Sequence, residues 1–127
     1  MTIWLIIGAG GALGAVLRHA VNMVVHRFAL TATFPYGILA VNVIGSAVIG
    51  ILAGLIASGR IHLTYELRTF LIVGLLGGFT TFSSLSLDTL TLARTGHWPQ
   101  AVANVTLHFG IGLLAVVLGF RLGHGSS

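Results

Sequence analysis

Cysteine and lysine are absent from this sequence of 127 residues, and Glu66 and Asp88 are its only acidic residues. The absence of cysteine excludes a disulfide scaffold. Charged residues make up 6% of the chain, whereas soluble globular domains contain roughly 25%. So few charges cannot coat a soluble domain, and an apolar content of 56% is too high for disorder. The composition therefore predicts one all-α integral membrane domain over residues 1–127.

The positive charge of the chain is not gathered into a patch. The formal net charge is +4 at pH 7, and every cation is an arginine that stands alone in the sequence. Because nucleic-acid binding needs clustered Lys and Arg, we expect no nucleic-acid partner. Two isolated carboxylates, with no nucleophile and base beside them, also predict that the protein is not an enzyme.

Four stretches are long and apolar enough to cross a bilayer, which takes about 20 residues. We expect helices over about 3–25, 36–58, 66–94 and 98–121. Turn signals that include Pro35, Gly59 and Gly96 separate them. The sequence thus predicts a multi-pass protein with four transmembrane helices, surrounded by membrane lipid.

The arginines divide evenly between the two sides of the membrane in this arrangement. One side would hold Arg60, Arg68 and Arg121, and the other would hold Arg18, Arg27 and Arg94. Positive charge in short loops normally sets the orientation of a membrane protein. An even division predicts insertion in both orientations and an antiparallel dimer. Glycine pairs four residues apart, at 10/14, 50/54 and 74/78, offer close packing faces either within one subunit or between two.

The middle of the third expected helix is unusually polar. Residues 77–86 read GGFTTFSSLS, which is poor helix-forming sequence placed near the bilayer centre. Non-helical backbone is tolerated at that depth only where it is buried in protein or lines a cavity. We therefore predict a break at about 76–82. The alternative is an unbroken helix whose hydroxyls bond to carbonyls one turn back. Free carbonyls at a break favour a hard cation such as Na⁺ or Ca²⁺, and free N–H groups favour an anion.

Three further polar residues lie at membrane depth. Asn42, in the second helix, can either bridge two helices or contact a ligand, and the sequence leaves both open. Arg18 can extend to the interface or face a water-filled vestibule. His108 shares a face of the fourth helix with Asn104, and we expect it to bond to a neighbouring helix rather than to take part in transport.

Three blocks of sequence resemble one known family. They are residues 10–18 (GGALGAVLR), 35–45 (PYGILAVNVIG) and 74–83 (GLLGGFTTFS). The chain resembles the CrcB/Fluc family of fluoride channels over essentially its whole length. The resemblance implies an antiparallel dual-topology homodimer in the cell inner membrane that passively exports fluoride and so lowers its cytoplasmic concentration.

The resemblance also implies site residues. The fluoride path would include Asn42, Thr81, Phe82, Ser83 and Leu85. The backbone carbonyls of Gly77 and Thr80 would hold a structural Na⁺ at the dimer interface, and Arg18 would lie near a vestibule. An amide N–H, rotatable hydroxyls and the positive edge of a phenyl ring can each face an anion. Such moderate donors suit conduction, because the ion must bind and also leave.

Three departures from the family pattern bear on this interpretation. Leu85 replaces a second phenylalanine, Asp88 replaces a glutamate, and Ile38 replaces a threonine. Leu85 removes half of an aromatic pair, which leaves open a weaker channel or a pairing with a paralogous subunit. Rival interpretations are a small dual-topology multidrug or cation exporter, for which Asp88 is the one candidate membrane acid, and an accessory subunit without a pore.

Overall fold

The computed structural model of the protein describes residues 1–29 and 33–125, so residues 30–32, 126 and 127 of the expected domain lie outside it. Helices make up most of the described residues, which contain no β-strand. They are α1 (Thr2–Phe28), α2 (Tyr36–Ala57), α3 (Tyr65–Arg68), the π-helix η1 (Thr69–Leu76), α4 (Gly77–Phe79), α5 (Phe82–Arg94) and α6 (Trp98–His124). The chain turns after α2 and after α5 at Gly59 and Gly96, whose φ angles of 74° and 82° favour glycine.

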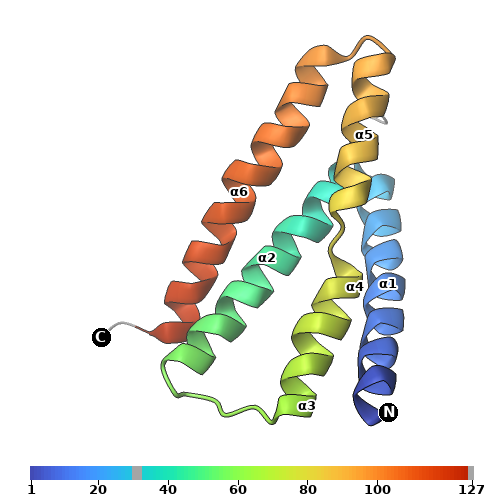
Figure 1. The fold of residues 1–127 in the computed structure, drawn as a ribbon. Coiled ribbons are helices and arrows are strands. Elements are labelled where there is room, and N and C mark those ends of the chain that lie inside the picture. Colours follow the sequence, from blue (N-terminus) through green and yellow to red (C-terminus); the bar gives the residue numbers. More distant parts are fainter. Residues whose placement is uncertain (30–32, 126–127) are drawn as a thin grey trace.

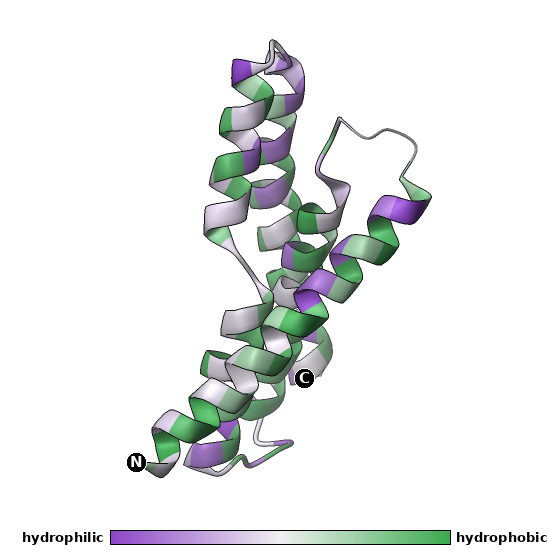
Figure 2. Cartoon of the chain, turned by 90° about the vertical axis from the view of Figure 1, so that its right-hand side faces the viewer, coloured by the Kyte–Doolittle hydropathy of each residue, from purple (hydrophilic) through white to green (hydrophobic). Residues whose placement is uncertain are grey.

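Four helical segments of the described chain are long and apolar enough to cross a membrane. They are Thr2–Phe28, Tyr36–Ala57, Tyr65–Arg94 and Trp98–His124. Their bounds differ from the predicted ones by three residues or fewer, which confirms the all-helical prediction with four such helices. Figure 2 shows hydrophobic residues along the helices, whereas hydrophilic residues gather at the loop ends and along the α5–α6 pair.

The third segment, Tyr65–Arg94, changes its packing partner halfway along. Its first half, which contains η1 and α4, packs against α1, and its second half, α5, packs against α6. Helix α2 lies between α6 and the first half of the third segment, and it packs closely along α6 (Figure 1). The N-terminus, the loop after α2 and the end of α6 lie at one end of the bundle, and the loop between α5 and α6 lies at the other.

Glycines bring the backbones of neighbouring helices together inside this one chain. A Cβ added at Gly10 would lie 2.8 Å from the carbonyl oxygen of Phe70, and one at Gly14 would lie 2.8 Å from the backbone nitrogen of Phe79. The glycines at the contact between α2 and α6 are Gly50, Gly54, Gly119 and Gly123. The sequence left open whether the glycine pairs pack within or between subunits, and the three predicted pairs all contact a neighbouring helix of the same chain.

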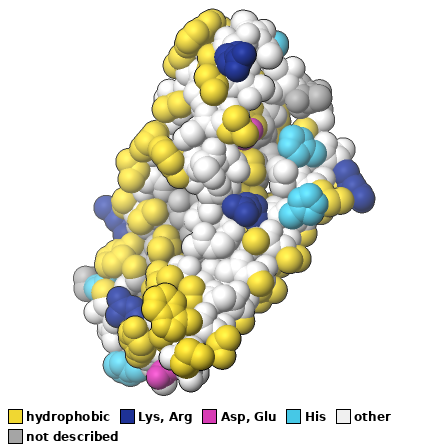
Figure 3. All heavy atoms as spheres, turned by 45° about the vertical axis from the view of Figure 1, so that its right-hand side comes forward, with side chains coloured by type: hydrophobic (Ala, Val, Ile, Leu, Met, Phe, Trp, Pro, Cys, Tyr) yellow, Lys and Arg dark blue, Asp and Glu magenta, His cyan; other side chains and the backbone are white. Residues whose placement is uncertain are grey.

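Large apolar side chains cover the outside of the bundle. Trp4, Phe28 and Leu122, for example, are 73%, 81% and 73% exposed in the single chain. Figure 3 shows hydrophobic side chains spread over one face, with arginine side chains scattered singly among them. Such a surface is suited to lipid or to a second subunit rather than to water.

We predict that Gly14→Ala lowers the stability of the folded protein. The added methyl group would press on the backbone of Leu75 and Phe79, and overpacking of this kind costs about 1–3 kcal/mol. The measurement is the thermal midpoint of the purified protein in detergent. The matched control is Gly8→Ala on the same helix, where no atom lies within 4 Å of the added Cβ. Because alanine favours a helix by about 1 kcal/mol over glycine, the control should keep or raise the midpoint. Equal midpoints for the two variants would contradict the packing argument.

Candidate functional site

Two extended residues connect α4 to α5. Thr80 has φ −85° and ψ 154°, and Thr81 has φ −151° and ψ 115°. Both lie within the stretch 76–82, where the sequence is poorest in helix-forming residues. At this point the backbone groups of the chain need partners from outside their own helix, because the bilayer supplies none.

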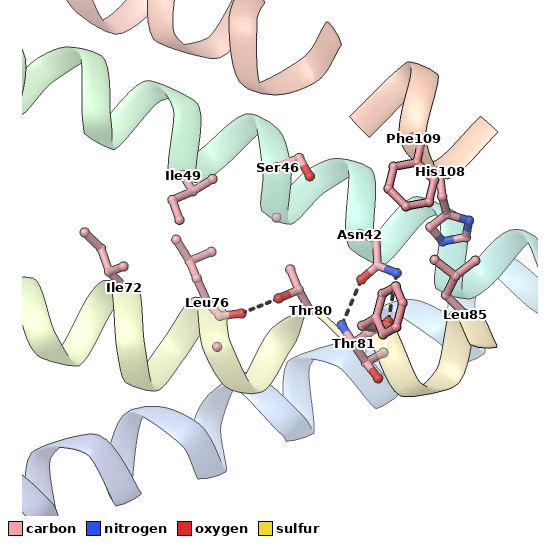
Figure 4. A pocket seen from close by; sticks show the side chains of 13 residues that line it. Asn42, Ser46, Ile49, Ile72, Leu76, Thr80, Thr81, Leu85, His108 and Phe109 are labelled. Carbon is pink, nitrogen blue, oxygen red and sulfur yellow. Dashed lines mark hydrogen bonds between the residues drawn. The ribbon is translucent and has the colours of Figure 1, made fainter. Parts of the chain in front are cut away.

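The side chain of Asn42 supplies those partners. Its Oδ1 accepts a hydrogen bond from the backbone N–H of Thr81 at 2.9 Å, and its Nδ2 donates to the carbonyl of Thr81 at 3.1 Å. The amide of Asn42 therefore bonds the extended backbone as a neighbouring β-strand would (Figure 4). Each Asn side chain carries two N–H donors, so one donor of Asn42 remains available after this pairing.

Gly45, further along α2, leaves the space that the connection occupies. Gly45 lies one turn after Asn42, and a Cβ added there would collide with the Cγ2 methyl group of Thr80. The hydroxyl of Thr80 donates back to the carbonyl of Leu76 at 2.9 Å, so it is satisfied within its own helix. Asn42 and Gly45 thus hold consecutive residues of the connection, one by hydrogen bonds and the other by leaving space.

Thr81 also begins α5 through its side chain. Its Oγ1 accepts a hydrogen bond from the backbone N–H of Ser84 at 3.1 Å, which is an N-cap. The same oxygen lies 3.1 Å from the hydroxyl of Ser83 and donates to the hydroxyl of Ser84 at 3.2 Å. The Thr81 hydroxyl therefore links the start of α5 to a small cluster of serines.

The connection exposes two helix ends of opposite polarity. In an unbroken helix the N–H of Thr81 would donate to the carbonyl of Gly77, but here it donates to Asn42. The segment that ends at Phe79 consequently presents carbonyl oxygens, which carry partial negative charge, toward the connection. Helix α5 starts at Phe82 and presents N–H groups with partial positive charge. One side of the site can hold a cation and the other an anion.

A cavity of about 400 Å³ opens beside the connection. Its lining comes from α2, from both halves of the third segment and from α6 (Figure 4). The lining residues are Asn42, Gly45, Ser46, Ile49, Ile72, Leu76, Gly77, Thr80, Thr81, Phe82, Leu85, His108 and Phe109. Most of these side chains are apolar, so a hydrophilic ligand would meet only a few polar groups there.

The structure brings most of the predicted site residues to this cavity. Those that line it are Asn42, Gly77, Thr80, Thr81, Phe82 and Leu85. Leu85 is 7% exposed, whereas Phe82 is 72% exposed and so lies at the rim. Ser83 is exposed and reaches the site only through Thr81. Arg18 is half-buried on α1 and is not part of the lining.

Seven lining residues were not among the predicted site residues, and they include Ser46, Phe109 and His108. Ser46 follows Asn42 by one helical turn, and this spacing placed it on the same face. We expected His108 to bond to a neighbouring helix, but its Nδ1 instead lies 2.8 Å from the carbonyl oxygen of Asn104 in its own helix. Only the packing of α6 against α2 and α5 decides that this face meets the cavity.

The chain is similar to known proteins over almost its whole length. Residues 5–120 match the family described as "CrcB-like protein, Camphor Resistance (CrcB)". The chain is 43% identical over 122 residues to the fluoride-specific ion channel FluC of Aeromonas salmonicida (strain A449), which is 96% of each chain. It is 48% identical over 120 residues to the FluC of Opitutus terrae (strain DSM 11246 / JCM 15787 / PB90-1), covering 94% of this chain and 90% of that one.

A third relative gives the same result. The fluoride-specific ion channel FluC of Paramagnetospirillum magneticum (strain ATCC 700264 / AMB-1) is 46% identical over 120 residues, covering 94% of this chain and 93% of the relative. The matched residues cover 96%, 93% and 90% of the lengths of these three relatives. The chain therefore belongs to the CrcB family of fluoride ion channels, and it is a multi-pass membrane protein and not an enzyme.

Proposed function

We propose that this protein is a fluoride-selective channel that passively exports F⁻ across the cell inner membrane and so lowers cytoplasmic fluoride. The observation that carries the proposal is the polar opening at mid-span, where Asn42 holds the extended backbone of Thr81 beside a cavity. The names of the FluC relatives support fluoride as the ion. The test is fluoride release from liposomes that contain only this protein, followed with a fluoride electrode, with chloride release as the control.

The path uses donors that compensate an anion without a full positive charge. Asn42 keeps one N–H after pairing with Thr81, and the start of α5 adds N–H groups and the positive end of a helix dipole. The ring edge of Phe82 at the rim carries partial positive charge. No arginine lines the cavity among the described residues, so a bound ion is not trapped by a permanent charge. Ser83, Thr81 and Leu85 complete the proposed path.

The working unit in this proposal is an antiparallel homodimer. The even division of arginines supports insertion in both orientations. The apolar exterior, with Phe82 72% exposed beside the cavity, offers a surface that a second copy can cover. Two copies then enclose what four helices leave open toward the lipid, and Arg18 lies near the vestibule of the path.

A structural Na⁺ fits the carbonyl side of the connection. The carbonyl of Gly77 loses its intrahelical donor, because the N–H of Thr81 is bonded to Asn42. Gly77 and Thr80 both line the cavity, and oxygen atoms at the C-terminal ends of broken helices suit Na⁺. In this proposal the carbonyls of Gly77 and Thr80 from both subunits hold the ion at the dimer interface.

We expect Asn42→Asp to abolish fluoride flux. The carboxylate can still accept from the N–H of Thr81, but it has no donor for the Thr81 carbonyl or for the anion, and its charge repels F⁻. Fluoride release from liposomes measures the effect, and size-exclusion chromatography checks that the variant assembles like the parent. Flux at the parental rate would remove Asn42 from the path.

Leu85→Phe should keep or raise fluoride flux. Leu85 is buried in the cavity wall, and a phenyl ring there would add a second positive edge. The matched control is Leu87→Phe on the same helix, where the side chain is 63% exposed and outside the cavity lining; it should leave flux unchanged. A large loss in the Leu85 variant alone would show that this cavity cannot accept the ring.

Removal of Na⁺ should loosen the dimer. If the carbonyls of Gly77 and Thr80 in both subunits share one ion, replacement of Na⁺ by a large organic cation leaves these oxygens unpaired. The expected result is a lower thermal midpoint and a smaller dimer fraction in size-exclusion chromatography. The same midpoint in both salts, at equal ionic strength, would argue against the ion.

A further inference from the structure

The hydroxyl group of Ser46 stands on the cavity wall without a partner from the described chain. Three side chains with a hydroxyl group line the cavity, those of Ser46, Thr80 and Thr81. Thr80 donates to the carbonyl of Leu76, and Thr81 donates to the hydroxyl of Ser84. Ser46 is half-buried on α2 and makes no hydrogen bond with any residue that the structure describes.

This free hydroxyl differs from most others in the helices of the protein. A serine or threonine in a helix can satisfy its hydroxyl by bonding to a carbonyl one turn back. Thr69, Ser86 and Thr89 do so, at 2.8 Å, 3.0 Å and 2.8 Å. Ser46 has the carbonyl of Asn42 at the same spacing but does not bond to it. Because an unpaired hydroxyl in apolar surroundings costs free energy, the partner of Ser46 has to come from the cavity.

Glycines leave space around the hydroxyl group of Ser46. On α6 a Cβ added at Gly112 would lie 3.8 Å from the Oγ of Ser46, so no side chain covers the hydroxyl from this residue. On α2 the neighbouring Gly45 also lacks a side chain, and the Cγ2 methyl group of Thr80 occupies that place. The hydroxyl can therefore rotate toward an ion in the cavity without displacing a side chain at Gly45 or Gly112.

Ser46 lies one helical turn from the amide of Asn42 (Figure 4). Asn42 keeps one N–H after its pairing with Thr81. Four residues of an α-helix advance about 6 Å along the axis, and residues at this spacing share one face. Two moderate donors at such a distance can bind an ion in succession, and conduction requires several sites that each release it.

The cavity wall beyond Ser46 is apolar. In Figure 4 the side chains of Ile49, Ile72 and Leu76 lie on the other side of Ser46 from Asn42. Such a wall offers nothing in exchange for the water that an ion loses. Of the described lining side chains in this part of the cavity, Ser46 alone has a hydroxyl that is free to donate.

We propose that the hydroxyl of Ser46 is a ligand of the fluoride path, which exchanges the ion with Asn42 and carries it along the apolar wall. This inference rests on the proposed function. The hydroxyl acts as a donor to the anion and not as an oxygen ligand of a cation, because Thr80 turns its methyl group toward α2 and keeps its hydroxyl bonded to Leu76. Loss of the Ser46 hydroxyl should therefore slow fluoride and leave the response to Na⁺ unchanged.

The test compares Ser46→Ala with the parent protein in liposomes, followed with a fluoride electrode. The variant removes one oxygen atom and adds no bulk. The initial rate of release should fall by about tenfold or more, because hydrogen bonds to charged groups are stronger than those between neutral groups. The fraction of trapped fluoride that is finally released counts the vesicles with a working channel, and it should stay the same. A purely structural role of Ser46 would lower this fraction and would overturn the inference.

Two further variants assign the effect to the hydroxyl. Ser46→Thr keeps a hydroxyl at the same position and should retain most of the parental rate. Ser58→Ala is the matched control at the end of the same helix, where the Oγ donates to the carbonyl of Leu55 at 3.2 Å and lies outside the cavity lining; it should keep the parental rate. The parental rate in Ser46→Ala, or equal slowing in Ser46→Ala and Ser46→Thr, would overturn the inference.

Measurements in two salts separate a ligand of fluoride from the other uses of a hydroxyl. The thermal midpoint in Na⁺ and in a large organic cation should differ by the same amount in Ser46→Ala and in the parent protein. If the difference disappears in the variant, Ser46 belongs to the Na⁺ site; if the dimer fraction falls, it contacts the second subunit. Either result would overturn the inference.

The proposed function and the inference fail in different ways. Absence of fluoride release from the parent protein would refute the proposed function, and the inference about Ser46 with it. Release by the parent protein at a rate that Ser46→Ala matches would refute the inference alone.

Discussion

The pair of hydrogen bonds between Asn42 and Thr81 is the constraint on which the rest of the site depends. A backbone that leaves the helical conformation inside a bilayer exposes an N–H and a carbonyl that water cannot reach, and each unsatisfied group costs several kcal/mol. One amide side chain, with an acceptor and a donor side by side, satisfies both groups of one residue. Without it the extended connection at residues 80 and 81 would tend to return to a helix, and the cavity beside it would close.

The connection has a second consequence for packing. A straight third helix could follow one neighbour only, but the two extended residues let its first half pack on α1 and its second half on α6. The glycine contact of α1 with η1 and α4 holds the first half closely, whereas α5 meets α6 through polar side chains, such as the amide of Asn104, which donates to the hydroxyl of Thr89 at 3.0 Å. The cavity forms where the halves separate, so packing and polarity are set by the same two residues.

The sequence predicted what depends on local composition, and it missed what depends on the meeting of distant segments. The four spans follow from length and hydropathy, and their ends agree to three residues or fewer. Asn42 was weighed between a helix bridge and a ligand contact, but its observed partner is a backbone 39 residues away, which no local pattern specifies. The glycine pairs left two packing partners open for the same reason. The sequence placed His108 on one helix face with Asn104, but its place on the cavity wall follows from how α6 packs on α2 and α5.

A mostly apolar wall gives each polar group in it unusual weight. In water a single donor competes with many others, but in this cavity the amide of Asn42, the start of α5 and the hydroxyl of Ser46 have few competitors among the described lining residues. In the proposed path, fluoride gives up strongly bound water, so the wall would have to replace that water with donors at a few points. In the proposed path, the departure at Leu85 removes one weak donor. In the proposed channel, conduction would therefore depend on the N–H groups and ring edges that face the ion more than on the net charge of the chain.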